Sequence, residues 1–299
     1  MRPVHVSLAV AVAVIWGLNF VVIDVGLQDF PPLLLSSMRY ALASLPLLLL
    51  RGMPPVAWRW VIAVGVVIGV VKFSLLFIGM DVGMPAGLAS LVLQAQALFT
   101  VVFATVVLRE RLVASQAAGL AIAFGGLALV ATGLHGQATP TGFALVIAAA
   151  AAWGVGNLLV KRAAPSDPLR FMSWICVVPP LPLLCLSLAF EGPSEIGSAL
   201  SNVDLGGIGA VLYIAFAATT IGWALWARLM GLYPASVVAP FALLVPIFGH
   251  GFAAVLLGEP VGVRELVAAV LVLGGVLLTL LAPRPAPRDA ISPQLAGIS

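Results

Sequence analysis

Long apolar runs alternate with short polar breaks along nearly the whole chain. Each run is close to the roughly 20 apolar residues that a helix needs to cross a lipid bilayer. The breaks hold charged or turn-forming residues, as in "QDFPP", "RERL" and "GLYP". This pattern predicts ten membrane-spanning helices, at residues 4–26, 32–50, 58–80, 86–108, 114–134, 140–160, 168–190, 206–230, 235–257 and 261–282.

Two segments fall outside this pattern. The connection "EGPSEIGSALSNVDLGG" is longer and more polar than the others, and we expect it to pack on the surface. Residues 284–299 are rich in proline and small residues, which predicts a disordered tail. The first apolar run is too long for a typical signal-peptide core, so we interpret it as a retained span.

The composition supports a membrane protein. Hydrophobic residues make up 62% of the 299 residues and charged residues only 8%, whereas soluble chains carry roughly 25% charged residues. The net charge of +3 rests on few ionisable groups and does not indicate a nucleic-acid partner. Arginine greatly outnumbers lysine, and Ala, Gly and Val dominate, which is typical of GC-rich bacteria. We therefore expect a multi-pass protein of a bacterial inner membrane.

The basic residues indicate how the chain is oriented. With the N-terminus in the cytoplasm and the sides alternating, the outer loops hold only Arg264 and most of the acidic residues. Cytoplasmic loops are usually enriched in Lys and Arg, so both termini are predicted to be cytoplasmic. The basic residues on that side are Arg2, Arg51, Arg59, Arg109, Arg111, Lys161, Arg162, Arg170, Arg228, Arg284 and Arg288.

The two halves of the chain resemble each other. "PPLLLSSMRYALASLPLLLL" matches "DPLRFMSWICVVPPLPLLCL", which pairs Pro46 with Pro182. The segments that begin at "PAGLASL" and "PASVVAP" also match each other. Continued along the chain, the same alignment pairs Gly125-Gly126 with Gly274-Gly275. Because each half has five spans, the second must enter the membrane from the opposite side. We predict two inverted repeats, residues 1–135 and 136–283, followed by the cytoplasmic tail, with a solute site between them near the midplane.

Two stretches carry a resemblance to a known family. "WGLNFVVIDVGLQDFPPLLLSSMRYALA" and "PIFGHGFAAVLLGEPV" resemble signatures of EamA-type members of the drug/metabolite transporter superfamily. Within it, the chain is most similar to bacterial amino-acid exporters of the YddG type. The resemblance implies ten helices, a central cavity and efflux of small metabolites. One departure is "LRERL", which lacks the Gly-Glu form that "LGEPV" keeps.

Two cations fall inside predicted spans. Lys72 lies slightly past the middle of the third span, where a lysine costs about 2.5–3.5 kcal/mol on insertion scales and usually marks a transport pathway. It either attracts a substrate carboxylate or pairs with Asp24. Arg39 could bind a substrate carboxylate through two hydrogen bonds, but we assign it first to a structural role, holding helix ends or carbonyls.

Polar and aromatic residues repeat in both halves. Asn19 and Asn157 occupy equivalent places, one helical turn from Trp16 and Trp153. The amides either join helices to one another or face the cavity, while neighbouring glycines let the helices approach. The two tryptophans lie inside their spans rather than at an interface, so we expect them to line the cavity.

Further candidates lie in the fourth, eighth and ninth spans. Gln96 and Thr100 share one helix face, and Gln94 points elsewhere on a regular helix. Thr220 and Trp223 share a face, and His250 either contacts substrate or packs as a neutral side chain. Amides and hydroxyls beside tryptophan suit a zwitterion with an apolar or aromatic side chain. Prolines expected to kink or hinge the helices are Pro46, Pro182, Pro240 and Pro246.

We therefore predict a secondary transporter that exports amino acids, aromatic or apolar ones above all, and related metabolites by alternating access. It would act as a monomer in contact with membrane lipid, without cofactor, metal or nucleic acid. The alternatives are a lipid-carrier flippase or another metabolite carrier of the same superfamily. A membrane enzyme is disfavoured, because the sequence has no GxSxG or HExxH motif and its three histidines are scattered.

Overall fold

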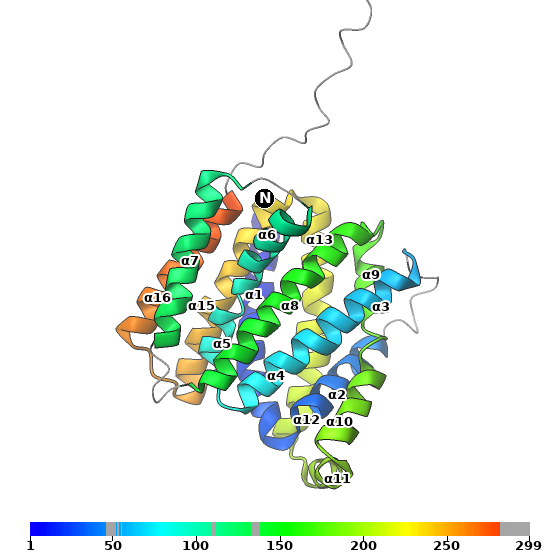
Figure 1. Cartoon of the computed structure of the whole chain (residues 1–299). Coiled ribbons are helices and arrows are strands. Elements are labelled where there is room, and N and C mark those ends of the chain that lie inside the picture. Colours follow the sequence, from blue (N-terminus) through cyan, green and yellow to red (C-terminus); the bar gives the residue numbers. More distant parts are fainter. Residues whose placement is uncertain (46–51, 53, 55, 109–111, 133–137, 282–299) are drawn as a thin grey trace, which may run out of the picture.

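The computed structural model describes residues 1–45, 52, 54, 56–108, 112–132 and 138–281, which form helices joined by short connections. Figure 1 shows the longer helices crossing the molecule side by side. We call the end where α1 begins the proximal end and the end that carries α11 the distal end. Pro46 and residues 284–299 lie outside the described residues, so the proline hinge and the tail predicted there stay predictions.

The first half of the chain folds into helices close to the predicted spans. In order these are α1 Pro3–Asp29, α2 Pro32–Ser44, α3 Trp58–Val64, η2 Gly65–Lys72, α4 Phe73–Asp81, α5 Ala86–Val92, α6 Ala95–Leu108 and α7 Ala114–Thr132. The second half follows the same plan. Its helices are α8 Pro140–Ala163, α9 Pro168–Ile175, α10 Pro180–Phe190, α11 Pro193–Asn202, α12 Leu205–Leu212, η3 Tyr213–Ile221, α13 Gly222–Leu232, α14 Ala235–Val238, η4 Ala239–Leu243, α15 Leu244–Phe252, η5 Ala253–Leu257 and α16 Val263–Leu281.

Within the described residues, nine helical runs are long and apolar enough to cross a membrane. They correspond to nine of the ten predicted spans. The exception is the span predicted at 32–50: α2 ends at Ser44, and residues 46–50 are outside the described part of the chain. The chain is therefore a multi-pass helical membrane protein, and its tenth span remains a prediction.

Local sequence explains where the helices begin. Proline suits the first turn of a helix, because the backbone N–H groups of that turn have no hydrogen-bond partner within the helix and proline lacks this group. Prolines open α1, α2, α8, α9, α10 and α11. Side-chain caps act at other starts: Thr139 and Asp204 accept the N–H of Gly142 and Gly207, three residues later. The backbone N–H groups of Gly207 and Gly206 hold the pKa of the Asp204 carboxyl below its usual range.

Two predicted spans contain a break in regular helix. α5 and α6 are separated at Leu93 and Gln94, and α9 and α10 at residues 176–179. The second break lies at "VVPPLP", where the prolines lack the backbone N–H that a helix interior needs. Pro182 itself lies in the first turn of α10, Pro240 in the 3₁₀ segment η4, and Pro246 is buried in α15.

The two halves use equivalent glycines where helices cross. A Cβ on Gly17 would lie 2.6 Å from the Cβ of Phe248, and a Cβ on Gly154 would lie 2.9 Å from the Cβ of Phe99. These glycines therefore let α1 meet α15 and α8 meet α6 at close range, as the sequence predicts. The two crossings correspond to each other in the sequence repeat, in which α1 is equivalent to α8 and α15 is equivalent to α6. π-Helical segments recur in the same way, η2 in the third predicted span and η3 in the eighth.

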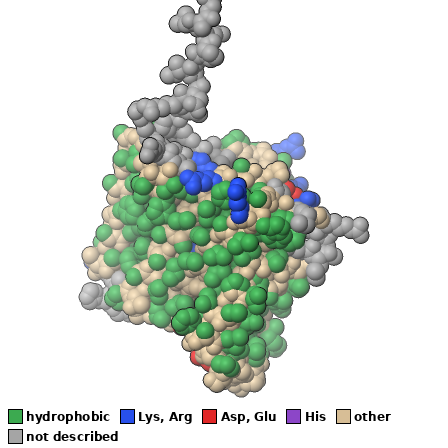
Figure 2. Space-filling view, turned by 45° about the vertical axis from the view of Figure 1, so that its right-hand side comes forward, with side chains coloured by type: hydrophobic (Ala, Val, Ile, Leu, Met, Phe, Trp, Pro, Cys, Tyr) green, Lys and Arg blue, Asp and Glu red, His purple; other side chains and the backbone are tan. Residues whose placement is uncertain are grey.

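The surface agrees with a bilayer setting. Figure 2 shows one face covered mainly by hydrophobic side chains, with Lys and Arg gathered near the proximal end. α11 forms the polar connection that the sequence predicts on the surface, and only Ile196 of this helix is buried. Basic side chains next to the proximal helix ends include Arg2, Arg59, Lys161, Arg162 and Arg170.

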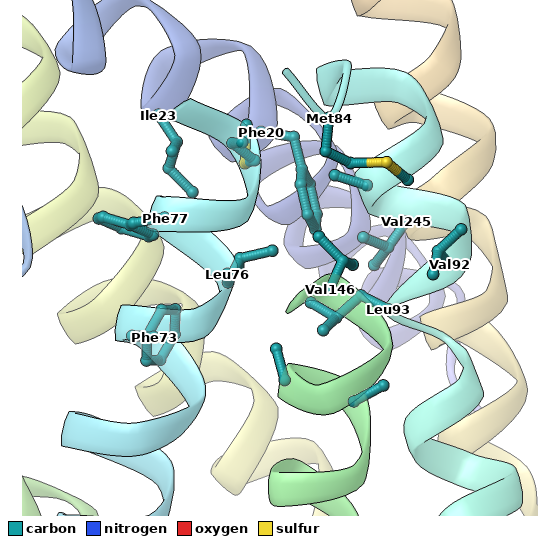
Figure 3. Close-up of a cluster of buried hydrophobic side chains, with 14 of the residues drawn as sticks. Phe20, Ile23, Phe73, Leu76, Phe77, Met84, Val92, Leu93, Val146 and Val245 are labelled. Carbon is teal, nitrogen blue, oxygen red and sulfur yellow. The ribbon is translucent and has the colours of Figure 1, made fainter. Parts of the chain in front are cut away.

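The distal half is closely packed around large apolar side chains (Figure 3). Ile23 and Phe77 have no exposed surface and Met84 is 1% exposed, although all three lie near the distal ends of their segments. Phe20 and Leu76 extend this cluster toward the middle of the bundle.

Two carboxylates of the second half cap helices of the first half at the distal end. Glu191 accepts the N–H groups of Leu33 (2.6 Å) and Leu34 (3.1 Å) in α2. Glu259 accepts those of Ala86 (2.7 Å) and Gly87 (3.0 Å) in α5. A carboxylate also interacts well with the positive end of a helix dipole. Burial nevertheless raises the pKa of Glu259, and the two backbone hydrogen bonds offset this only in part.

We expect Glu259→Gln to loosen the first turn of α5. Glutamine keeps the size but has one acceptor oxygen and no charge, and a lost cap costs about 1 kcal/mol. The amides of residues 86–89 should therefore exchange with deuterium roughly fivefold faster by mass spectrometry. Glu265→Gln is the matched control, because Glu265 lies in the first turn of its own helix, α16, and caps no other helix in the described part of the chain. Unchanged exchange at residues 86–89 in Glu259→Gln would show that the cap is dispensable.

Candidate functional site

A cavity of about 270 Å³ lies inside the bundle and is lined from both halves of the chain. It reaches from the middle toward the proximal end, since its wall includes Trp226 in α13 and Leu280 near the end of α16. Several residues labelled in the buried cluster of Figure 3, among them Phe20, Leu76 and Leu93, also line the cavity. The other lining residues are Trp16, Asn19, Arg39, Lys72, Phe73, Gln94, Gln96, Ala97, Trp153, Asn157, Ala218, Trp223, Ala239, Ala242, Leu243, Val245 and Val276.

Arg39 and Lys72 form a cationic wall together with aromatic rings. Each is only 3% exposed. The Nζ of Lys72 lies 3.3 Å from the ring centroid of Phe73 and 4.3 Å from that of Trp153. The guanidinium carbon of Arg39 lies 3.9 Å from the same Phe73 centroid. Two buried cations thus share one aromatic ring, and π faces rather than carboxylates are their nearest charge-stabilising partners.

Neither cation is neutralised within the described part of the chain. No Asp or Glu lines the cavity there, and Lys72 forms no ion pair with Asp24, so that sequence-based alternative is wrong for this structure. Arg39 donates from Nε to the Oγ1 of Thr219 at 2.8 Å, while its buried Nη1 has no partner. Unpaired donors of this kind are expensive to bury, and a carboxylate would satisfy them.

Tryptophan side chains form a second wall. The ring of Trp16 lies 5.2 Å from that of Trp223 and 5.3 Å from that of Trp226 between centroids. The Nε1 of Trp16 donates to the backbone oxygen of Ala218 at 2.9 Å. Ala218 precedes Thr219, the partner of Arg39, so neighbouring residues of η3 hold the aromatic and the cationic walls.

Amides occupy a third part of the cavity wall. Asn157 donates from Nδ2 to Gln96 Oε1 (2.9 Å) and Thr100 Oγ1 (3.0 Å), which joins α8 to α6. Thr100 takes part through this bond without lining the cavity itself. Asn19 differs, because its buried Oδ1 has no hydrogen-bond partner among the described residues. Asn157 thus fits the helix-joining interpretation and Asn19 the cavity-facing one.

This difference corrects one sequence-based equivalence. When Trp16 is aligned with Trp153, the residue opposite Asn19 is Gly156, and Asn157 lies one position further on. One residue turns a side chain by about 100° around a helix. The two amides therefore meet different neighbours, and they are not symmetry partners.

Two further expectations change with the structure. Gln94 lines the cavity together with Gln96, which a regular helix would not allow. The helix is interrupted at Leu93 and Gln94, so the argument from helical spacing fails there. Arg39, which we assigned first to a structural role, lies in the cavity wall and also holds η3 through Thr219.

Thr220 and His250 lie outside the cavity wall. The hydroxyl of Thr220 donates to the backbone oxygen of Ala215 at 3.1 Å, within its own π-helical segment. His250 lies near Gly87 and Glu259 on the distal side, where a Cβ on Gly87 would be 2.8 Å from its Nδ1. Pro182, Pro240 and Pro246 are also absent from the wall among the described residues.

Sequence reasoning missed Phe73 and Trp226 as wall residues. Phe73 directly follows Lys72, and its position beside a buried cation was the available signal. Trp226 lies three residues after Trp223, which places both on one helix face. The same spacing argument was applied to Thr220 and Trp223, but the π-helical geometry of η3 separates those two.

Comparisons with known proteins agree with this architecture. The sequence matches the EamA-like transporter family over residues 4–132 and again over 140–281. It is 42% identical over 279 residues to a probable amino-acid metabolite efflux pump of Salmonella typhimurium, covering 91% of this chain and 93% of that protein. A protein of Escherichia coli with the same description is 38% identical over the same shares.

A solved crystal structure shares the fold, with a TM-score of 0.63 at 19% identity, over 94% of this chain and 99% of that one. Two matched segments of one family cover nearly all of the described residues, and the cavity lies between them. The chain belongs to the EamA-like transporter family, and it is a membrane transporter rather than an enzyme.

Proposed function

We propose that the protein exports amino acids and related amino-acid metabolites, those with apolar or aromatic side chains above all, across the bacterial inner membrane. The observation that carries this proposal is one cavity with two opposed kinds of wall. Arg39 and Lys72 offer uncompensated positive charge, and Trp16, Trp223 and Trp226 offer a broad aromatic surface. A carboxylate suits the first wall and an apolar side chain the second.

The relatives support the same substrate class. Two of them, similar along nearly their whole length, are described as probable amino-acid metabolite efflux pumps. Gln96, Asn157 and Thr100 form a hydrogen-bonded group beside the cationic wall and would fix the solute's orientation. Asn19 lies in the same wall, and its buried Oδ1 accepts no hydrogen bond from the described residues.

The mechanism that fits this arrangement is alternating access between two inverted repeats of five spans, 1–135 and 136–283. The proximal end would face the cytoplasm, with both termini on that side, because the basic side chains gather there. The cavity would then extend toward the cytoplasmic end, with the cluster of Figure 3 on its outward side. One chain encloses the whole cavity, so a monomer suffices.

Transport by purified protein in liposomes tests the proposal. Vesicles would be loaded with labelled L-phenylalanine, L-leucine, N-acetyl-L-phenylalanine or 3-phenylpropanoate, and protein-dependent release measured. We expect release of at least one compound to exceed that from protein-free vesicles. If none of the four moves, the assignment to amino acids and their metabolites is wrong.

The tryptophan wall gives a second readout. Trp223→Ala should reduce release about tenfold, because an aromatic truncated to alanine loses roughly 1.5 to 3 kcal/mol of apolar contact. Trp58→Ala is the matched control, since Trp58 is 42% exposed at the beginning of α3 and packs on Trp174 outside the cavity. Equal activity of both variants would contradict a substrate-binding role for the aromatic wall.

A further inference from the structure

We infer that the cavity prefers amino-acid derivatives whose nitrogen is uncharged, N-acylated amino acids above all, over the free zwitterions. This inference rests on the proposed export function and specifies the substrate class of the same site. It follows from three features: the positive charge of the cavity wall, the contacts of Lys72 with two of the aromatic rings there, and one unpaired amide oxygen.

The charge of the wall disfavours an ammonium group. The two ionisable side chains of the described cavity wall are Arg39 and Lys72, and no carboxylate there offsets them. A zwitterion brings no net charge, so its ammonium group would enter a field made by two nearby cations. An N-acyl amino acid brings one negative charge and no positive one. It therefore gains the attraction between carboxylate and cations without the repulsion.

The aromatic faces do not replace the missing carboxylate. Rings commonly hold an ammonium group through cation–π contacts. Here the rings of Phe73 and Trp153 already lie against the Nζ of Lys72. Trp16 packs between Trp223 and Trp226 with its indole N–H bonded to a backbone oxygen. The protein's own cation takes up two of the rings, and the others present mainly an apolar surface.

One hydrogen-bond acceptor of the cavity-wall residues, the Oδ1 of Asn19, lacks a donor. Asn19 lines the cavity and is 8% exposed, and its Oδ1, which has almost no exposed surface of its own, accepts no hydrogen bond from the described residues, so it would meet a ligand once the side chain turns toward the cavity. A buried acceptor without a partner is costly, so a ligand N–H would be favourable there. An N-acyl amino acid keeps one N–H on the carbon next to its carboxylate. Simple carboxylates without nitrogen cannot satisfy Asn19, and N-acyl amino acids satisfy both it and the cations.

Release of three related compounds from liposomes containing the wild-type protein tests the inference without any variant. L-Phenylalanine, N-acetyl-L-phenylalanine and 3-phenylpropanoate share one aromatic ring and one carboxylate. We expect kcat/KM for release of N-acetyl-L-phenylalanine to exceed that of L-phenylalanine about tenfold, with 3-phenylpropanoate between them. Equal or faster release of L-phenylalanine would overturn the inference and leave the export function standing. Release of none of the three would overturn the inference, and the export function would fall with it if L-leucine were not released either.

Two variants assign the preference to its residues. Lys72→Met should reduce the ratio of N-acetyl-L-phenylalanine to L-phenylalanine release at least threefold, because it removes one cation from the wall. Asn19→Leu should bring N-acetyl-L-phenylalanine down to the rate of 3-phenylpropanoate. Each ratio is internal to one protein sample, so a lower amount of folded carrier does not change it. Ratios equal to those of the wild type in both variants would contradict the assignment to Lys72 and Asn19.

Discussion

Lys72→Met is expected to reduce transport about tenfold to a hundredfold, because a hydrogen bond to a charged group contributes roughly 1.5 to 3 kcal/mol. Methionine matches the length of lysine and suits the buried, ring-lined environment of Lys72, which is 3% exposed. Removing an uncompensated charge from lipid-embedded protein should leave stability unchanged or improved. The measurement is kcat/KM for substrate release from liposomes, alongside the thermal midpoint of the detergent-solubilised protein.

Arg59→Met is the matched control for Lys72→Met. Arg59 lies in the same predicted span as Lys72, but it is exposed at the proximal end. Its removal should leave kcat/KM within about twofold of the wild type, since exposed charges contribute little. Lys72→Arg should keep part of the activity, because it preserves the charge and changes the shape of the donor. Full activity of Lys72→Met would exclude a direct part for this lysine in binding.

Gly275→Leu is expected to destabilise the protein by about 3 kcal/mol, at the upper end for forcing atoms into a filled space. α7 and α16 cross at this glycine: a Cβ on Gly275 would lie 2.5 Å from the backbone oxygen of Gly119 and 2.6 Å from the nitrogen of Ala123. Backbone atoms cannot move aside as a flexible side chain can. The measurement is the thermal midpoint, and we expect it to fall by several degrees.

Its neighbour supplies the control. A Cβ on Gly274 would meet nothing within 4 Å, so Gly274→Leu should leave the midpoint nearly unchanged. The equivalent pair in the first half behaves alike, since Gly126 is packed against Leu271 and Val272 and Gly125 has open space. Similar midpoints for Gly274→Leu and Gly275→Leu would show that the α7–α16 crossing is not a stability determinant.

Features that depend on the spacing of apolar runs, on the internal repeat and on unusual residues inside a span could be predicted from the sequence. The apolar runs gave helices at the expected places, and the repeat gave equivalent helix crossings at Gly17 and Gly154. Lys72, Trp16 and Trp153 were expected in the cavity wall because a cation or an indole inside a span is unusual, and all three line it.

Features that depend on irregular backbone could not be predicted. The break at Leu93 brings Gln94 into the wall, and the π-helical geometry of η3 takes Thr220 out of it. Neither irregularity is marked by a proline or glycine at the positions concerned, so helical periodicity was the available guide. Arg39 was the harder case, since the sequence could not show that its Nε would bond Thr219 and leave Nη1 free.

The carboxylate caps of Glu191 and Glu259 have a consequence for the empty carrier. Both lie on the second half of the chain and hold helices of the first half at the distal end. Separating the halves at that end would break both caps together, so the two caps oppose opening of the unloaded protein there. A solute bound between the halves would then have to supply the free energy that breaking both caps requires.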